Sequence, residues 1–227
     1  MTLLAIFSYP GGNEAMLRHF GYFVRQRADK VWGIGTTDGK CEWPSLMDNV
    51  IDIGRDSYID GPHLAQRMVD SVAALLNEDW EYLILCEYDT LILNQIDLGK
   101  MTQILASHLA GGQTFQARVP RFYHNPWVFK RVAAYDFVAH GQKAILDGVC
   151  GFRTHTGLAM PEGSPDVFFA YVAEQMGVVV QDNVWTEYSR NNLKDTGNLE
   201  GAREAFRKGI DVIHGVKSRE ELDYIVS

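Results

Sequence analysis

The feature that most constrains the fold is a short aliphatic run followed at once by acids, in the stretch EYLILCEYDTLIL from Glu81 to Leu93. Tyr82 to Cys86 has the length and composition of a buried strand. Glu87 and Asp89 follow it one residue apart, and in an extended segment such residues point to the same side. Open α/β sheets bind ligands at the carboxyl ends of their strands. The sequence therefore predicts two carboxylates beside a ligand crevice.

Two interpretations of this acidic pair stay open at this point. Two oxygen-rich side chains on one side suit a hard divalent cation, which takes its remaining ligands from water and from a substrate's phosphates. Alternatively, Glu87 and Asp89 are ordinary solvated loop residues behind a core strand. Other parts of the chain must distinguish the two.

Strands and helices alternate in the part of the chain that precedes this run. Apolar runs predict strands at Leu3–Phe7, Val31–Gly35 and Val50–Ile53. Helical spacing of apolar residues predicts one helix after the N-cap candidate Asn13 and another after Asp60-Gly61-Pro62. This alternation is typical of βαβ units. We therefore expect an α/β fold with a mostly parallel, Rossmann-like central sheet flanked by helices.

The second half of the sequence is less regular. Predicted helices are Met101–Leu109, a helix with Pro165 or Asp166 in its first turn, Ala202–Lys208 and Glu220–Val226, and predicted strands are Thr114–Val119, Val178–Gln181 and Trp185–Tyr188. The region from Pro120 to Val138 is rich in aromatic and basic residues. Such a stretch either packs in the core or lines a cleft for a sugar or a phosphate.

Composition limits the classes of protein that fit. The 227 residues, of which 46% are hydrophobic and 22% charged, suit one soluble globular domain. A net charge of -8 argues against a nucleic-acid partner, because such proteins carry basic surfaces. Three scattered cysteines indicate a reducing compartment, so we expect a cytoplasmic protein. We see neither a signal peptide nor an apolar run long enough to span a membrane.

The element order and the acidic motif together resemble the GT-A fold of nucleotide-sugar-dependent glycosyltransferases. In that family an α/β half binds the nucleotide, a strand ends in a D-x-D-type metal motif, and a late histidine often completes the metal site. Glu87-Tyr88-Asp89 stands in the place of the motif, with Glu in its first position. The resemblance implies one domain, with residues 1–97 as the nucleotide-sugar-binding half and residues 98–227 as the acceptor-side half, which includes a C-terminal metal and phosphate segment.

The resemblance also implies a metal site. Asp89 would bind Mn²⁺ or Mg²⁺ directly and bridge it to the diphosphate of the donor. Glu87 would belong to the same site and contact the ribose or a metal-bound water. His214 matches the late histidine of the family, and an imidazole ligand suits Mn²⁺ better than Mg²⁺.

Donor contacts follow from the same resemblance. Phe7, Ser8 and Tyr9 lie where the first strand of the family meets the base and ribose, and Tyr88 is the middle residue of the motif. Lys217 would neutralise a phosphate as the leaving group departs. The expected donor is a nucleoside diphosphate sugar, with UDP-sugar as the first choice, and the expected acceptor is a carbohydrate or another hydroxyl compound.

Asp166 matches the catalytic acid that inverting members of the family place at the start of a helix beneath the acceptor. A sugar hydroxyl that attacks an anomeric carbon needs such a base. The alternative is a helix cap, because the helix dipole favours a carboxylate there and lowers its pKa.

Four further histidines have no expected role in the metal site. His63, His124, His140 and His155 have no partner at metal spacing, so we expect them to be structural or on the acceptor side. Two rivals to a glycosyltransferase stay open: a sugar-nucleotidyltransferase, and a non-catalytic nucleotide-sugar-binding module of the same fold. The Ser8 to Gly12 turn supports neither a P-loop nor a dinucleotide-binding motif.

Overall fold

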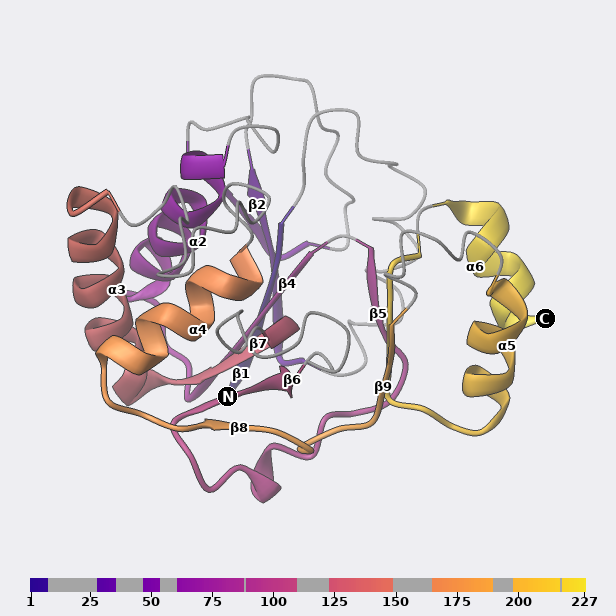
Figure 1. Ribbon diagram of the computed structural model, residues 1–227. Coiled ribbons are helices and arrows are strands. Elements are labelled where there is room, and N and C mark those ends of the chain that lie inside the picture. Colours follow the sequence, from indigo (N-terminus) through magenta and orange to yellow (C-terminus); the bar gives the residue numbers. More distant parts are fainter. Residues whose placement is uncertain are drawn as a thin grey trace.

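A computed structural model of the chain describes residues 1–7, 28–35, 47–53, 61–87, 89–109, 123–148, 165–189, 198–216 and 218–227. Its elements form a layered α/β structure, with three helices on one side of a large sheet and a small sheet with two further helices on the other (Figure 1). The expected α/β class is therefore confirmed.

Seven of the described strands make up the large sheet, in the order β3-β2-β1-β4-β7-β6-β8. They are β1 Thr2–Phe7, β2 Lys30–Gly35, β3 Asn49–Asp52, β4 Tyr82–Glu87, β6 Leu105–Leu109, β7 Tyr123–Lys130 and β8 Val180–Gln181. Strands β3, β2, β1 and β4 pair in parallel, and β8 pairs in parallel with β6. Only β7 runs antiparallel to its two neighbours in the described sheet. The sheet is therefore mostly parallel, as predicted.

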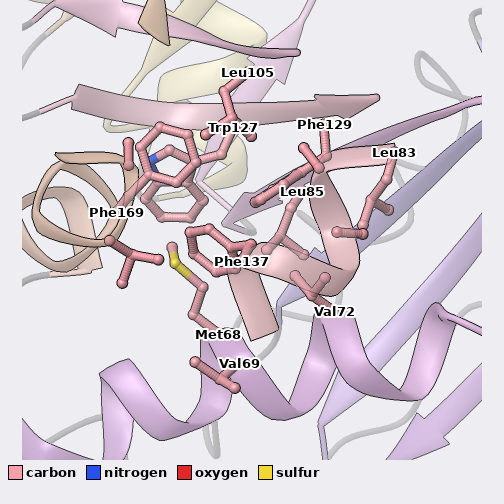
Figure 2. Close-up of a cluster of buried hydrophobic side chains, with 14 of the residues drawn as sticks. Met68, Val69, Val72, Leu83, Leu85, Leu105, Trp127, Phe129, Phe137 and Phe169 are labelled. Atoms are coloured by element: carbon pink, nitrogen blue, oxygen red, sulfur yellow. The ribbon is translucent and has the colours of Figure 1, made fainter. Parts of the chain in front are cut away.

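Three helices cover one face of this sheet. They are α2 Gly61–Leu75, α3 Arg131–Leu146 and α4 Pro165–Gln175. Figure 2 shows Met68 and Val72 of α2, Phe137 of α3, Phe169 of α4 and Trp127 of β7 as members of one apolar cluster. Phe169 is fully buried and lies within 6.2 Å of Trp127 between ring centroids. These large side chains fix the height of α4 above the sheet.

A small sheet covers the opposite face. Its order is β5-β10-β9, with β5 Thr90–Ile92, β10 Val212–His214 and β9 Glu187–Ser189. Strand β10 pairs antiparallel with β5 and parallel with β9. Helices α5 Leu199–Arg207 and α6 Arg219–Val226 flank it, and a 3-10 turn, η1, spans Leu98–Lys100. Because both faces of β4 are covered, alternate residues of this strand enter two cores, which explains its continuous apolar run.

Most described elements lie where the sequence predicts them, with ends shifted by a few residues. One prediction is wrong: the expected helix over Met101–Leu109 is not formed, and Leu105–Leu109 is strand β6. Leu105 and Ala106 have high helix propensity, but pairing with β7 on one side and β8 on the other outweighs it. The expected helix after Asn13 and the strand Thr114–Val119 lie outside the described residues. Across the part of the chain described here, we find no helix of the length and apolar character that a bilayer crossing requires.

Candidate metal centre

At the carboxyl end of β4, Asn125 of β7 holds Glu87 in place. Asn125 is fully buried. Its Oδ1 accepts a hydrogen bond from the Glu87 backbone N–H at 3.1 Å and another from the Thr90 hydroxyl. Its Nδ2 donates to Glu87 Oε2 at 3.0 Å. One amide side chain therefore orients both the backbone and the carboxylate of Glu87.

Pairing between β5 and β10 brings a histidine from far along the chain to this carboxylate. His214 lies opposite Thr90 in that pair. Directly after it, Gly215 has a φ of 90°, a conformation that favours glycine, and the N–H groups of Gly215 and Val216 both donate to the Asp89 carbonyl oxygen at 3.0 Å. The backbone of β10 is thereby fixed against Asp89.

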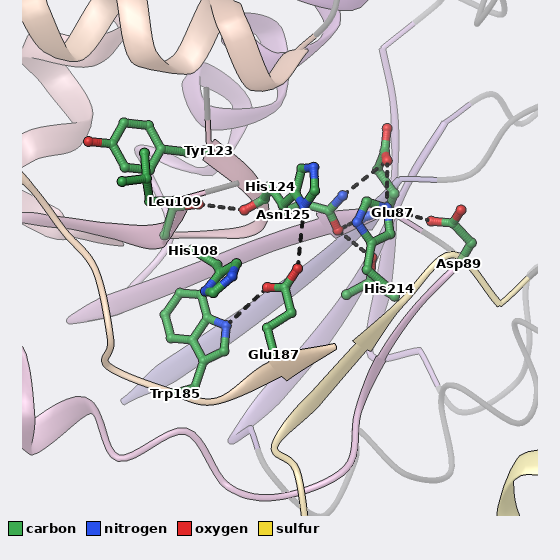
Figure 3. A network of polar contacts seen from close by, with 12 residues as sticks. Glu87, Asp89, His108, Leu109, Tyr123, His124, Asn125, Trp185, Glu187 and His214 are labelled. Carbon is green, nitrogen blue, oxygen red and sulfur yellow. Dashed lines mark hydrogen bonds and ion pairs between the residues drawn. The ribbon is translucent and has the colours of Figure 1, made fainter. Parts of the chain in front are cut away.

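Glu87, Asp89 and His214 consequently converge (Figure 3). His214 Nε2 lies 3.6 Å from Asp89 Oδ1 and 3.9 Å from Glu87 Oε2. All three residues are buried, with 9%, 1% and 3% of their surface exposed for Glu87, Asp89 and His214. Placing two carboxylates and an imidazole together away from water is costly unless their charge is compensated.

This trio suits a divalent cation. One ligand atom from each residue lies within 4.8 Å of the other two. Carboxylates are preferred ligands of Mg²⁺ and Mn²⁺, and a single imidazole shifts the preference toward Mn²⁺. The role of Glu87, Asp89 and His214 as ligands stays a prediction, but their donor set fits the expected ion.

A second group of potential metal ligands lies beside the first. His124 of β7 and Glu187 of β9 approach each other to 3.5 Å between Nδ1 and Oε1, and the Trp185 indole N–H donates to Glu187 Oε2 at 3.4 Å. The rings of His124 and His214 meet edge to face, with centroids 5.2 Å apart. His124, Glu187 and His214 also satisfy the distance requirement for a metal group. The expectation that His124 has no partner at metal spacing is therefore wrong.

Asp166 lies in the first turn of α4, as predicted, and the charges of His124, Glu187 and Asp89 act on its carboxyl. Burial raises the pKa of its carboxyl from 3.8 to about 7. His124 and a backbone hydrogen bond from Asn125 lower the pKa, whereas Glu187 and Asp89 raise it further. The expected lowering by the helix dipole is wrong, because desolvation and two neighbouring carboxylates outweigh the dipole.

The same charges act on the neighbours of Asp166. Burial has the largest effect on the His124 imidazole and lowers its pKa, but Glu187, Asp166 and Glu87 together raise the pKa above its usual value. Burial also raises the pKa of the Cys86 thiol, and Glu87 and Asp89 add to this effect. The centre is thus a buried, strongly negative region at the carboxyl end of β4.

Several predicted donor contacts cannot be placed. Ser8, Tyr9, Tyr88 and Lys217 lie outside the described residues. The backbone of Phe7 is described, and it pairs with Glu87 at the ends of β1 and β4. Phe7 and Glu87 therefore end their strands at the same edge of the sheet, and the donor contact of Phe7 stays a prediction.

The basic residues of the aromatic stretch lie elsewhere where they are described. Lys130 is at the opposite end of β7 from Asn125 and donates to the Met101 carbonyl oxygen at 2.8 Å. Arg131 donates to the carbonyl oxygens of Leu76 and Glu78, in the turn after α2, and stacks on Trp80. Neither Lys130 nor Arg131 therefore compensates the negative charge of the buried carboxylates. Trp127 is fully buried in the core, which confirms the packing interpretation for this residue.

Sequence reasoning missed three residues of the centre: His124, Asn125 and Glu187. They come from strands that reach the centre only through long-range pairing, and no local pattern marks them. Glu187 lies within the predicted strand Trp185–Tyr188, whereas His124 and Asn125 lie in the aromatic stretch, where the sequence predicts no strand. No protein-family model matches this chain, and no curated protein matches it, so the function must be inferred from the residues of the centre.

Proposed function

We propose that the protein is a metal-dependent glycosyltransferase that moves a hexosyl group from a nucleoside diphosphate sugar, with UDP-sugar as the expected donor, to a hydroxyl acceptor. The observation that carries this proposal is the convergence of Glu87, Asp89 and His214 at the carboxyl end of β4. In sheets of this kind that edge is where ligands bind. Two carboxylates with one imidazole fit an ion that also binds phosphate oxygens.

We assign the following roles to the residues of the centre. Asp89 and His214 hold Mn²⁺ or Mg²⁺, and Glu87, fixed by Asn125, completes the set or holds a metal-bound water. When bound, the cation neutralises the donor diphosphate and stabilises the nucleoside diphosphate that leaves. Burial of the three ligands keeps competing water from the reacting bond.

Asp166 is the candidate base for the acceptor hydroxyl. A pKa of about 7 means that near neutral pH a large fraction of this carboxylate is ionised while it still has useful basicity. The proton of the attacking hydroxyl would pass to the Asp166 carboxylate as the new bond to the sugar forms. Asp166 Oδ1 is buried and has no hydrogen-bond partner among the described residues, so it is available to receive this proton.

The architecture supports the same assignment. A parallel strand cluster leads to the acidic motif, and the second half of the chain supplies His124, Asp166, Glu187 and His214 to the same centre. The GT-A-like fold, the single domain with halves 1–97 and 98–227, and the cytoplasmic location that the sequence predicts are parts of this proposal.

Calorimetry of UDP binding with and without Mn²⁺ tests the metal assignment. The native protein should bind UDP in the presence of Mn²⁺, and Asp89→Asn should lose that metal-dependent binding. The matched control is Asp147→Asn, on an exposed residue after α3. Unchanged metal-dependent binding in Asp89→Asn would contradict the proposal.

A turnover assay separates the alternatives. Release of UDP from a UDP-sugar in the presence of Mn²⁺ is expected for a glycosyltransferase. Pyrophosphate release from UTP and a sugar phosphate would instead indicate a sugar-nucleotidyltransferase. Nucleotide binding without turnover across a panel of donors and acceptors would indicate a binding module.

A further inference from the structure

His124, Glu187 and His214 form the second group of potential metal ligands, and its composition differs from that of the first. We propose that these three residues are a separate site for a zinc-type cation, and that this site competes with the Glu87, Asp89 and His214 group for the shared imidazole. Zinc would then displace the ion of the first group and act as an inhibitor. The site itself does not depend on the proposed glycosyltransferase activity.

The distances fit one ion. His124 Nδ1 and Glu187 Oε1 are 3.5 Å apart, and one nitrogen of His214 lies within 4.8 Å of both. Zinc binds imidazole nitrogen and carboxylate oxygen at about 2.0–2.2 Å in tetrahedral geometry, so two ligand atoms on one ion lie about 3.3–3.6 Å apart. The His124 and Glu187 atoms already meet this separation, and the His214 nitrogen, which lies within 4.8 Å of both, must move toward them by at most about 1.3 Å.

Glu187 is oriented as a ligand would be. Its side chain has no exposed surface, and Trp185 holds Oε2 by a hydrogen bond from the indole nitrogen. Oε1 is buried and makes no hydrogen bond of good geometry within the described residues, although it faces His124. A buried carboxylate with one oxygen fixed and the other directed at two imidazoles is the usual arrangement of a ligand with an outer-shell partner.

The two groups should select different ions. The first has two carboxylates and one imidazole, whereas the second has two imidazoles and one carboxylate. Two histidines and one glutamate, with an open position for water, form a common zinc donor set. At a given site zinc also binds more tightly than manganese in the general order of divalent metals. The side chain of His124 is 12% exposed, so an ion can reach the site from solvent.

Competition follows from the chemistry of imidazole. A neutral imidazole has one nitrogen with a lone pair and one that carries a proton. His214 can therefore bind one cation at a time, whichever nitrogen it uses. A zinc ion held by His124 and Glu187 removes His214 from Asp89, and manganese then has only the two carboxylates.

Zinc titration of the metal-free protein tests this proposal directly. The native protein should bind one Zn²⁺, and Glu187→Gln and His124→Asn should each weaken that binding by at least about 10- to 100-fold, the range measured even for outer-shell partners. Asp89→Asn should retain the Zn²⁺ affinity. Glu204→Gln, on the exposed face of α5, is the matched control. Circular dichroism verifies that every variant is folded. If one of the two ligand variants does not fold, the other still tests the proposal.

Electron paramagnetic resonance of free Mn²⁺ measures the competition. Zn²⁺ added to the manganese-loaded native protein should release Mn²⁺, and release should need at least about tenfold more Zn²⁺ in Glu187→Gln. The proposal is overturned if Glu187→Gln binds Zn²⁺ as tightly as the native protein, if Asp89→Asn loses Zn²⁺ binding as Glu187→Gln does, or if both ions bind together without displacement. Failure of UDP binding would reject the proposed function and leave these three results unaffected.

Discussion

The carboxyl of Asp166 makes stability depend on pH in a direction opposite to that of most aspartates. Its pKa rises from 3.8 to about 7 on folding. The folded protein therefore keeps a proton that the unfolded chain releases, and the free energy of unfolding falls as pH rises from about 4 to about 7. The substitution Asp166→Asn removes this titration, so the variant should gain stability relative to the native protein as pH rises.

The size of the effect follows from the same shift. A rise from 3.8 to about 7 is about 3 units, which corresponds to about 4 kcal/mol at most. We therefore expect Asp166→Asn to differ little in stability from the native protein near pH 4 and to be up to about 4 kcal/mol more stable near pH 8.

Urea unfolding of the metal-free protein, followed by circular dichroism in the presence of a chelator, measures this difference. The control is Asp136→Asn, on the exposed side of α3, for which the difference should stay near zero at every pH. A constant difference between Asp166→Asn and the native protein from about pH 4 to about pH 8 would refute the reasoning, because it would mean that folding leaves this carboxyl unperturbed.

Three other substitutions test the site and the core. Asn125→Ala removes the hydrogen-bond partner of the Glu87 N–H and carboxylate. We expect the free energy of unfolding in urea to fall by about 2–4 kcal/mol, and Mn²⁺ binding in calorimetry to weaken. A change in stability with unaltered Mn²⁺ affinity would contradict the orienting role of Asn125. Phe169→Ala leaves a cavity in the cluster between α3, α4 and β7 and should lower the free energy of unfolding by about 3–5 kcal/mol. A loss below about 1 kcal/mol would contradict the full burial of Phe169. Gly141→Ala places a Cβ 2.6 Å from Val69 Cγ2 at the contact of α2 and α3. Overpacking of about 1–3 kcal/mol should exceed the helix gain of about 1 kcal/mol, so a higher melting temperature would contradict this close packing.

Local sequence patterns determined much of the fold. The strands β1, β2, β3 and β4 and the helix α2 follow from apolar runs and helical spacing, because each residue's preference is set by neighbours a few positions away. The start of α4 at Pro165 also follows from local chemistry. Leu105–Leu109 shows the limit, since that segment takes its strand form from β7 and β8, which are distant in sequence.

Some residues of the candidate centre likewise follow from the sequence, and others only from the tertiary structure. The sequence alone marked Glu87 and Asp89, because two acids directly behind a buried strand form a local pattern, and a family resemblance added His214 and Asp166. Only the tertiary structure placed His214 against Asp89, through the pairing of β5 with β10. It also brought in Asn125, His124 and Glu187 and reversed the expected pKa shift of Asp166. Burial and long-range strand pairing decide these features, and neither is encoded in the residues next to the ones they affect.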